Sequence, residues 1–273
     1  MNRDSSFRGK VALVSGASRG VGFATAKALA EGGAKVVITA RGAERLAKSE
    51  ALLREAGADV VAVTGDVGHR EDAQAMVDAA LASFGRLDIV VSNAGVSMRG
   101  RFEDLSPEVC EQVIQTNLTG SVHLARAAVG PVIESRGNIV FVSSIAGIFG
   151  LPGASAYCAS KGALTGLSES LRLELIPKGV HIGVVYLGFT EHDPEKRILA
   201  ADGKPVPPDR PAHHTQAYAA GLVVRMIRRR KRRLIMTPAG NLGWLIYRIS
   251  PGLVERVILW AQSSQWGIFK RFS

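Results

Sequence analysis

The chain has 273 residues, 47% of them hydrophobic and 21% charged, which is enough apolar material for one large core in a single domain. The two cysteines, Cys110 and Cys158, exclude a disulfide scaffold, and no cluster has metal-ligand spacing, so we predict a reducing compartment and no metal site. The N-terminus is polar and no run of about 18 apolar residues occurs, so we expect a cytoplasmic protein without a spanning helix.

The net charge of +10 belongs to one end of the chain. Residues 1–220 hold equal numbers of basic and acidic residues, whereas residues 221–273 hold 11 Lys and Arg against Glu255 alone. A catalytic domain has no evident need of this asymmetry, so the C-terminal part is expected to have a role of its own.

Seven short apolar runs alternate with amphipathic segments along the chain. The runs predict buried parallel strands at residues 11–14, 36–38, 60–63, 89–91, 139–142, 182–186 and 234–236. The segments between them predict helices at about 20–32, 42–56, 70–84, 106–134, 154–176 and 216–230. We therefore predict an α/β fold with a doubly wound, parallel, seven-stranded sheet, a Rossmann fold, over residues 1–238. Residues 239–273 are predicted to form a helical extension.

A glycine-rich turn follows the first predicted strand. It contains Gly16, Ser18, Arg19, Gly20 and Gly22. Gly16 suits a tight turn, Gly20 a close approach of backbone to pyrophosphate, and Gly22 the packing of helix on strand. The turn and the Ala-rich helix after it predict a nucleotide pyrophosphate at the helix N-terminus, although a plain βα connection would also explain the glycines.

The residues at the end of the second strand indicate which nucleotide cofactor the site would bind. An NAD site usually has an acidic residue there, which binds the ribose 2′-hydroxyl, but this stretch reads Thr39-Ala40-Arg41-Gly42. Arg41 and Arg19 suit a 2′-phosphate instead, through charge-assisted hydrogen bonds. The sequence thus predicts NADP(H) as the cofactor.

The loops after the third and fourth strands supply further candidates. Asp66, followed by Val67, has a carboxylate that suits the adenine amino group, or it is an N-cap for the helix starting near His69. Asn93, close to Gly95, is either a turn residue or a scaffold of the cofactor pocket.

Tyr157 and Lys161 are four residues apart and lie on one face of a predicted helix. A nearby ammonium favours phenolate and lowers the tyrosine pKa from about 10, toward the working range of a general acid. Ser144 suits a hydrogen bond to a substrate oxygen, and Asn117 suits a water that connects Lys161 to solvent. Taken singly, each has a commoner structural explanation: a core tyrosine, a surface lysine, a loop serine or a helix asparagine.

These residues carry a resemblance to the short-chain dehydrogenase/reductase family, over about Lys10 to Pro238. The family's T-G-x-x-x-G-x-G motif has Ser15 in place of threonine, and its N-N-A-G motif is Ser92-Asn93-Ala94-Gly95. The family's tetrad falls on Asn117, Ser144, Tyr157 and Lys161. The resemblance implies that Tyr157 exchanges a proton with substrate and that Lys161 binds the nicotinamide ribose. Ser144 would orient the carbonyl and Asn117 would support the proton relay.

One stretch departs from the family pattern. After the sixth strand the family often has P-G followed by a threonine that contacts the nicotinamide carboxamide, whereas here Leu187 precedes Gly188. Thr190 or His192 would take the threonine's role. The resemblance further implies a mobile substrate lid, here residues 188–214, and a homodimer or homotetramer.

The basic end combines the run Arg228–Arg233 with apolar and tryptophan-bearing segments separated by Pro251-Gly252. Such a combination, over residues 228–273, suits an anionic membrane surface and hence a peripheral location. Packing over the substrate cleft or against another subunit is the alternative, and nucleic acid is a weaker one because no recognition motif accompanies the charge.

Together these features predict an NADP-dependent oxidoreductase that interconverts a ketone or aldehyde and an alcohol on a hydrophobic, lipid- or steroid-like substrate. The rival hypotheses are a non-catalytic nucleotide-binding scaffold and a nucleic-acid-binding protein that works through the basic end.

Overall fold

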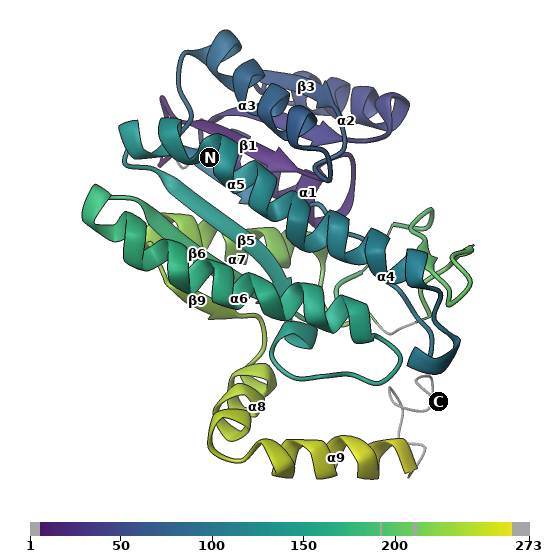
Figure 1. The fold of residues 1–273 in the computed structure, drawn as a ribbon. Helices are drawn as coiled ribbons and strands as arrows, with labels where there is room; N and C mark the ends of the chain where they lie inside the picture. The colour runs from purple at the N-terminus through teal and green to yellow at the C-terminus, as the bar shows by residue number, and fades with distance from the viewer. Residues whose placement is uncertain (1–5, 192, 210–211, 264–273) are drawn as a thin grey trace.

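The computed structural model describes residues 6–191, 193–209 and 212–263 and has a seven-stranded sheet at its centre (Figure 1). All neighbouring strands of this sheet are parallel, in the order β3-β2-β1-β4-β5-β6-β9. The strands are β1 (Val11–Ser15), β2 (Lys35–Ala40), β3 (Val60–Thr64), β4 (Ile89–Ser92), β5 (Asn138–Ser144), β6 (His181–Leu187) and β9 (Arg233–Ile235). The predicted doubly wound sheet of seven strands is confirmed.

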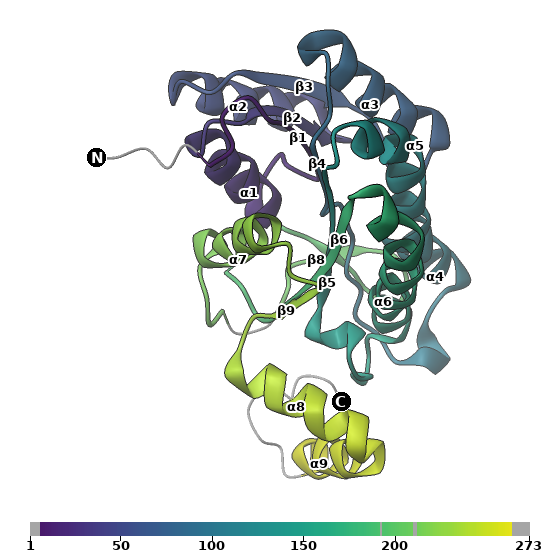
Figure 2. The ribbon, with the colours of Figure 1, turned by 90° about the vertical axis from the view of Figure 1, so that its left-hand side faces the viewer.

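Helices cover both faces of the sheet, as the edge-on view in Figure 2 shows. One face carries α1 (Gly20–Glu31), α2 (Ala43–Glu55) and α7 (Gln216–Arg229), and the other carries α3 (Arg70–Phe84), α4 (Pro107–Ile114), α5 (Gly120–Glu134) and α6 (Ser155–Leu175). Strand residues alternate between two core clusters, so that Ala12 and Val14 face α1 while Leu13 faces the opposite layer. Strands buried on both faces account for the continuous apolar runs in the sequence.

The predicted helix at 106–134 is interrupted. Ser106 caps α4 by accepting a hydrogen bond from Val109 N, and a π-helical turn, η2 (Gln115–Thr119), joins α4 to α5. Such turns are frequent at functional sites because they redirect a side chain without ending the helix. Here the turn contains Asn117.

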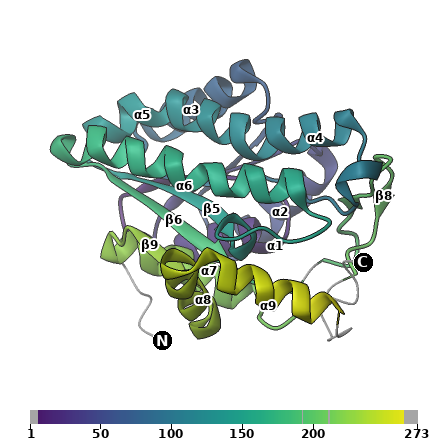
Figure 3. The ribbon, with the colours of Figure 1, turned by 60° about the horizontal axis from the view of Figure 1, so that its bottom comes forward.

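Two segments lie outside the layered body. The predicted lid, residues 188–214, contains the short strands β7 (Ile198–Leu199) and β8 (Pro205–Val206), which pair antiparallel. At the C-terminal end, α8 (Pro238–Ile249) begins with Thr237 as its N-cap and is followed by α9 (Pro251–Ser263). These two helices stand apart below the sheet in Figure 1, and Figure 3 shows them from that side. Within the described ranges no helix combines the length and hydropathy needed to span a bilayer.

Candidate active site

A cavity of about 750 Å³ opens at the carboxyl ends of the strands. Parallel α/β sheets bind their ligands at this edge, where the strand order reverses between β1 and β4. All but one of the predicted site residues line it: Gly16, Ser18, Arg19, Gly20, Gly22, Arg41, Asp66, Val67, Asn93, Gly95, Ser144, Tyr157, Lys161, Gly188 and Thr190. Asn117 is the exception, and it is fully buried beside the cavity.

Two positions of the glycine loop are packed so closely that no side chain would fit at them. A Cβ on Gly22 would lie 2.2 Å from Gly16 O, and one on Gly16, whose φ is +65°, would lie 2.8 Å from Ala94 Cα. A Cβ on Gly20 would meet nothing within 4 Å, so the first turn of α1 is open toward the cavity at this position. The open helix N-terminus and the close approach of backbone at Gly16 and Gly22 fit a pyrophosphate.

Ser15 and Asn93 join this loop to the end of β4. Asn93 Nδ2 donates to Ser15 O at 2.9 Å and to Gly16 O at 3.1 Å, while Ser15 Oγ accepts from Asn93 N and Ala94 N. Asn93 therefore holds the glycine loop against the loop after β4, and its part in a cofactor pocket stays a prediction. Ser15, which replaces the family's threonine, supplies the hydroxyl for the same connection.

Asp66 is not a helix N-cap. The N-cap of α3 is His69, and Asp66 Oδ1 instead accepts from Gly68 N at 2.9 Å, which closes a local turn. Its other oxygen lies 3.5 Å from Arg41 Nη1 at the cavity wall. The N-cap alternative was wrong because the chain makes one further turn before the helix begins.

Lys161 is buried, with its ammonium group at the end of β5. Nζ donates to Val142 O at 2.9 Å, and Ser143 Oγ donates to Lys161 O at 2.9 Å. Burial lowers the pKa of Lys161 to about 8, helped by the positive charge of Lys196. The group is still mostly protonated at neutral pH, so it places a positive charge one helical turn from Tyr157.

Asn117 fixes the loop that faces this ammonium. Its Oδ1 accepts from Val96 N at 2.8 Å, and Nδ2 donates to Val96 O at 2.9 Å and to Ser160 Oγ at 3.0 Å. A Cβ on Gly95 would lie 3.0 Å from Asn117 Oδ1 and 3.3 Å from Lys161 Nζ, so both groups converge there. Both ends of the amide bond to protein, so the side chain is a clamp between the β4 loop and α6. Its place in a proton relay stays a prediction.

Ser144 and Tyr157 face the same cavity from neighbouring elements. Ser144 ends β5, and its Oγ accepts from Ala146 N at 3.2 Å in the turn η3 (Ile145–Gly147). A Cβ on Gly147 would lie 2.7 Å from Lys161 O, so the turn packs directly on α6. This close contact brings the hydroxyl and the half-buried phenol to one wall of the cavity.

A third arginine accompanies the two predicted at the nucleotide end. Arg45, in the first turn of α2 and four residues after Arg41, lines the cavity and forms ion pairs with Asp193 and Glu195 of the lid. Arg19 Nη1 donates to Glu195 O at 3.1 Å. Arg45 was not predicted from the sequence, because the motif that indicates the nucleotide ends at the second strand. The available signal was its position four residues after Arg41, about one helical turn.

The lid also contacts the loop after β4. Arg99 N donates to Leu199 O at 2.8 Å, and Leu199 N donates to Ser97 O at 2.9 Å. Thr190 is buried and forms an isolated bridge with His214, beside the cavity. Its nicotinamide contact stays a prediction, and the alternative residue, His192, lies outside the described residues.

A family model described as short chain dehydrogenase matches residues 10–202. The chain belongs to the short-chain dehydrogenase/reductase family. It is 37% identical to rat dehydrogenase/reductase SDR family member 4 over 192 residues, which are 69% of this chain and 68% of the relative. It is also 30% identical to the ketoacyl reductase HetN of a Nostoc species over 259 residues, which are 92% of this chain and 89% of that one.

Solved structures of the family have the same fold. A short-chain dehydrogenase/reductase from Burkholderia phymatum in complex with NAD has a TM-score of 0.81 at 27% identity, covering 91% of this chain and 96% of its own. A metagenomic short-chain oxidoreductase in complex with NADP has a TM-score of 0.70 at 29% identity, covering 84% and 97%. Solved relatives with this fold are thus in complex with NAD in one case and with NADP in the other.

Proposed function

We propose that the chain is an NADP-dependent oxidoreductase that interconverts a ketone or aldehyde and an alcohol on a hydrophobic substrate. The observation that carries this proposal is the shared cavity, which holds a phenol, a hydroxyl and a buried ammonium at one end and arginines at the other. Relatives have been solved with NAD and with NADP, so family membership leaves the choice of cofactor open.

Arginine chemistry supports NADP. The stretch after β2 has no carboxylate for a ribose 2′-hydroxyl, and Arg19, Arg41 and Arg45 converge on the cavity beside it. Guanidinium groups bind phosphate through paired, charge-assisted hydrogen bonds.

The chemistry follows from the positions of three side chains. A bound nicotinamide supplies or accepts the hydride. In the reductive direction Ser144 Oγ donates a hydrogen bond to the substrate oxygen, and Tyr157 Oη transfers its proton to that oxygen as negative charge develops. The Lys161 ammonium stabilises the phenolate that Tyr157 becomes, and solvent then restores the proton.

Apolar side chains in the cavity wall support an apolar substrate. The lining includes Met98, Ile145, Leu151, Phe189 and Leu199. Of these, Met98, Leu151 and Leu199 pack in one cluster with Tyr157. Groups of this kind orient a substrate mainly by burying its apolar surface, while Ser144 and Tyr157 fix the position of its oxygen.

The test of chemistry is NADPH oxidation with long-chain and steroidal ketones, comparing wild type with Tyr157→Phe. We expect turnover to fall at least about a hundredfold in the variant while NADPH affinity, measured by titration calorimetry, is retained. NADPH binding without turnover on any carbonyl would favour the non-catalytic nucleotide-binding alternative.

The test of cofactor choice compares NADPH with NADH. Arg41→Ala should raise the KM for NADPH roughly tenfold and leave that for NADH almost unchanged, because only the 2′-phosphate uses the guanidinium. Arg126→Ala, at an exposed position on α5, is the matched control. An equal change for both cofactors would contradict the assignment of Arg41 to the phosphate.

A further inference from the structure

The helical hairpin α8–α9 exposes an unusual amount of apolar surface. Seven of the 13 large hydrophobic side chains exposed in the described ranges lie on these two helices: Leu242, Leu245, Ile249, Leu253, Val257, Leu259 and Trp260. Ile249 is 77% exposed and Trp260 58%. Exposed apolar side chains gathered in this way mark a surface that contacts a partner or a membrane.

The exposed side chains are arranged by helical spacing. Leu242, Leu245 and Ile249 follow one another at intervals of three and four residues along α8, and so fall on one face. Leu253, Val257 and Trp260 do the same along α9. Another side of α8 is used inside the protein, because Trp244 packs against the core and a Cβ on Gly240 would lie 2.8 Å from Ile235 Cγ2.

A cluster of cations lies at the base of the hairpin. A recess of about 340 Å³ is lined by Lys231, Arg232, Arg233, Arg248 and Trp244. The Arg233 guanidinium lies 3.3 Å from the centroid of the Trp244 ring, and that of Arg248 lies 5.3 Å from it. Arg232 pairs with Glu169, the carboxylate found beside this cluster. We call these four cations the hairpin cluster.

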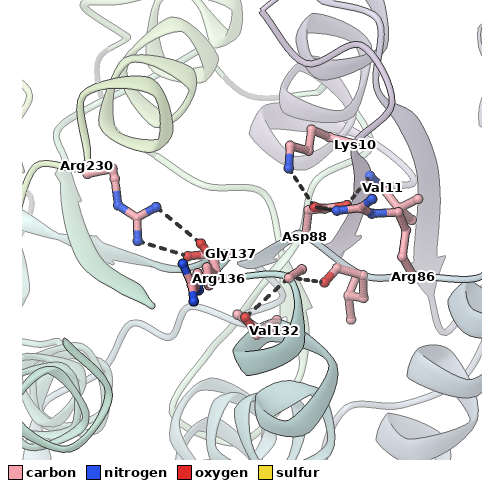
Figure 4. Close-up of polar contacts among 10 residues, drawn as sticks. Lys10, Val11, Arg86, Asp88, Val132, Arg136, Gly137 and Arg230 are labelled. Carbon is pink, nitrogen blue, oxygen red and sulfur yellow. Dashed lines mark hydrogen bonds and ion pairs between the residues drawn. The ribbon is translucent and has the colours of Figure 1, made fainter. Parts of the chain in front are cut away.

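Arg230, although adjacent in the sequence, has a different role. Its guanidinium donates to the backbone carbonyls of Arg136, Gly137 and Gly179, which ties α7 to the opposite side of the sheet (Figure 4). Within the basic run, Arg230 is therefore an internal anchor, whereas Lys231, Arg232 and Arg233 belong to the hairpin cluster.

We propose that the α8–α9 hairpin docks on an anionic membrane surface, with its apolar faces in the interface and the hairpin cluster against lipid phosphates. Amphipathic helices bind in this way when basic residues flank an apolar face, and each cation near the surface strengthens binding. A second copy of the chain would bring two hairpin clusters together, and nucleic acid would leave the aliphatic side chains uncovered.

The position of α8 connects docking with the cavity, a consequence that rests on the proposed function. A Cβ on Gly243 would lie 3.5 Å from the Phe149 ring, which is also 6.2 Å from the Tyr247 ring. Phe149 belongs to the loop that follows Ser144. A docked hairpin would thus bring the substrate side of the cavity close to the lipid, from which a hydrophobic substrate would enter.

Vesicle binding by the full chain tests the docking without any assay of activity. We expect co-sedimentation with vesicles of phosphatidylcholine and phosphatidylglycerol and much weaker co-sedimentation with phosphatidylcholine alone. Leu245→Asp with Ile249→Asp should weaken binding more than about tenfold, whereas Leu52→Asp with Leu173→Asp, two exposed leucines on α2 and α6, should leave it unchanged. Thermal melting of each variant establishes that it is folded.

The hairpin cluster has its own matched comparison. Lys231→Gln with Arg248→Gln should weaken binding to the anionic vesicles about thirtyfold, and Lys27→Gln with Arg126→Gln, which removes the same charge elsewhere, should weaken it far less. Equal loss in the two pairs, or no preference of the wild type for anionic vesicles, would overturn the proposal. Two other results would also overturn it. One is light scattering that shows the wild type as an oligomer and the variant with Leu245→Asp and Ile249→Asp as a monomer; the other is binding to oligonucleotides but not to vesicles.

Discussion

The two edges of the sheet use polar residues in opposite ways. At the amino edge, the buried Asp88 carboxylate accepts from Arg86, Lys10 and the backbone N of Val11 at 2.6–3.0 Å (Figure 4). Burial by itself would raise the pKa of Asp88, but the hydrogen bonds from Arg86, Val11 and Lys10 outweigh it and lower the pKa below its usual value. These groups satisfy one another, so the charge of Asp88 is used in holding the fold together.

At the carboxyl edge the polar groups surround a cavity instead. The Lys161 ammonium is buried, and no carboxylate is among its hydrogen-bond partners found in the described residues. At the nucleotide end, Arg45 pairs with two carboxylates of the lid, and Arg41 pairs with Asp66. The same sheet thus obtains stability from one edge and keeps the other available for binding. Substitutions at the two edges should therefore change different measured quantities.

The largest effect on stability is expected at the amino edge. Asp88→Asn should lower the free energy of unfolding at neutral pH by about 2 to 3 kcal/mol, because a buried charged acceptor loses its ionic hydrogen bonds to half-exposed partners. Urea denaturation measures this, and NADPH affinity should not change. The pKa of Asp88 is lower in the folded than in the unfolded protein. The difference in unfolding free energy between wild type and Asp88→Asn should therefore shrink as the pH falls below about 4, the pKa of an ordinary aspartate, toward the lowered pKa of the folded state.

Asp59→Asn is the control for this prediction. Asp59 forms an exposed ion pair with Lys35 at 3.2 Å, and its loss should change stability by less than about 1 kcal/mol. Similar losses at the two positions would remove the distinction between the buried network and an ordinary surface pair.

The carboxyl edge should show a pH effect of opposite sign. The buried ammonium of Lys161, with its pKa lowered to about 8, costs stability below that pH, and the cost disappears as the pH rises toward the unfolded value of 10.5. Between pH 7 and about pH 9.5, the unfolding free energy of the wild type should rise by about 2 kcal/mol relative to Lys161→Met. Parallel pH profiles of the two proteins, measured by urea denaturation without cofactor, would contradict the burial of a charged lysine.

A smaller effect on stability is expected at Arg230, where the strain of a left-handed backbone can be separated from the hydrogen bonds of the side chain. The residue is left-handed, with a φ of 45°, at the C-cap of α7, and its side chain bonds to three backbone carbonyls. Arg230→Gly loses the bonds but relieves the strain, whereas Arg230→Ala loses the bonds and keeps the strain, so Ala should be the less stable by roughly 1 kcal/mol. Thermal melting of the two variants checks the order, and equal stability would show that the conformation carries no strain.

The smallest effect concerns the lid. Glu195 is 73% exposed on its side chain and pairs with Arg45, so Glu195→Gln should release the arginine and raise NADPH affinity by about twofold. Titration calorimetry with NADPH and NADH would measure it. A gain in affinity for both NADPH and NADH would indicate that the lid opens more easily. It would not fit a competition between Glu195 and the 2′-phosphate for Arg45.

Much of the fold could be predicted because it is encoded locally. Continuous apolar runs identified the seven strands of the main sheet but not the two-residue strands β7 and β8, and the helix boundaries came within a few residues, except where η2 interrupts the segment from Pro107 to Glu134. Helical periodicity hardly changes across a single π-turn, so nothing in the pattern marked the interruption. The motif that led to Tyr157 and Lys161 was equally local, because four residues span one turn of helix.

The roles of Asp66 and Asn117 could not be predicted in the same way. A polar residue between a strand and a helix suits both a cap and a turn, and only the path of the backbone decided that Asp66 closes a turn. For Asn117 the sequence suggested a bound water, whereas the structure shows its amide bonded to Val96 and to Ser160. Those partners come from two other elements that the sequence does not place beside it.

By itself, the sequence determined the order of strands and helices along the chain, the glycine turn, the spacing of Tyr157 and Lys161, and the concentration of positive charge at the C-terminal end. Only the tertiary structure decided that Lys161 is buried, that Arg45 and Arg19 meet a lid residue, and that Arg230 is an anchor while Arg233 lies over Trp244. The physical reason is distance along the chain: periodicity and propensity act over a few residues, whereas Arg19 and Glu195 are 176 positions apart. Burial and pairing of charges arise only when such distant segments pack together.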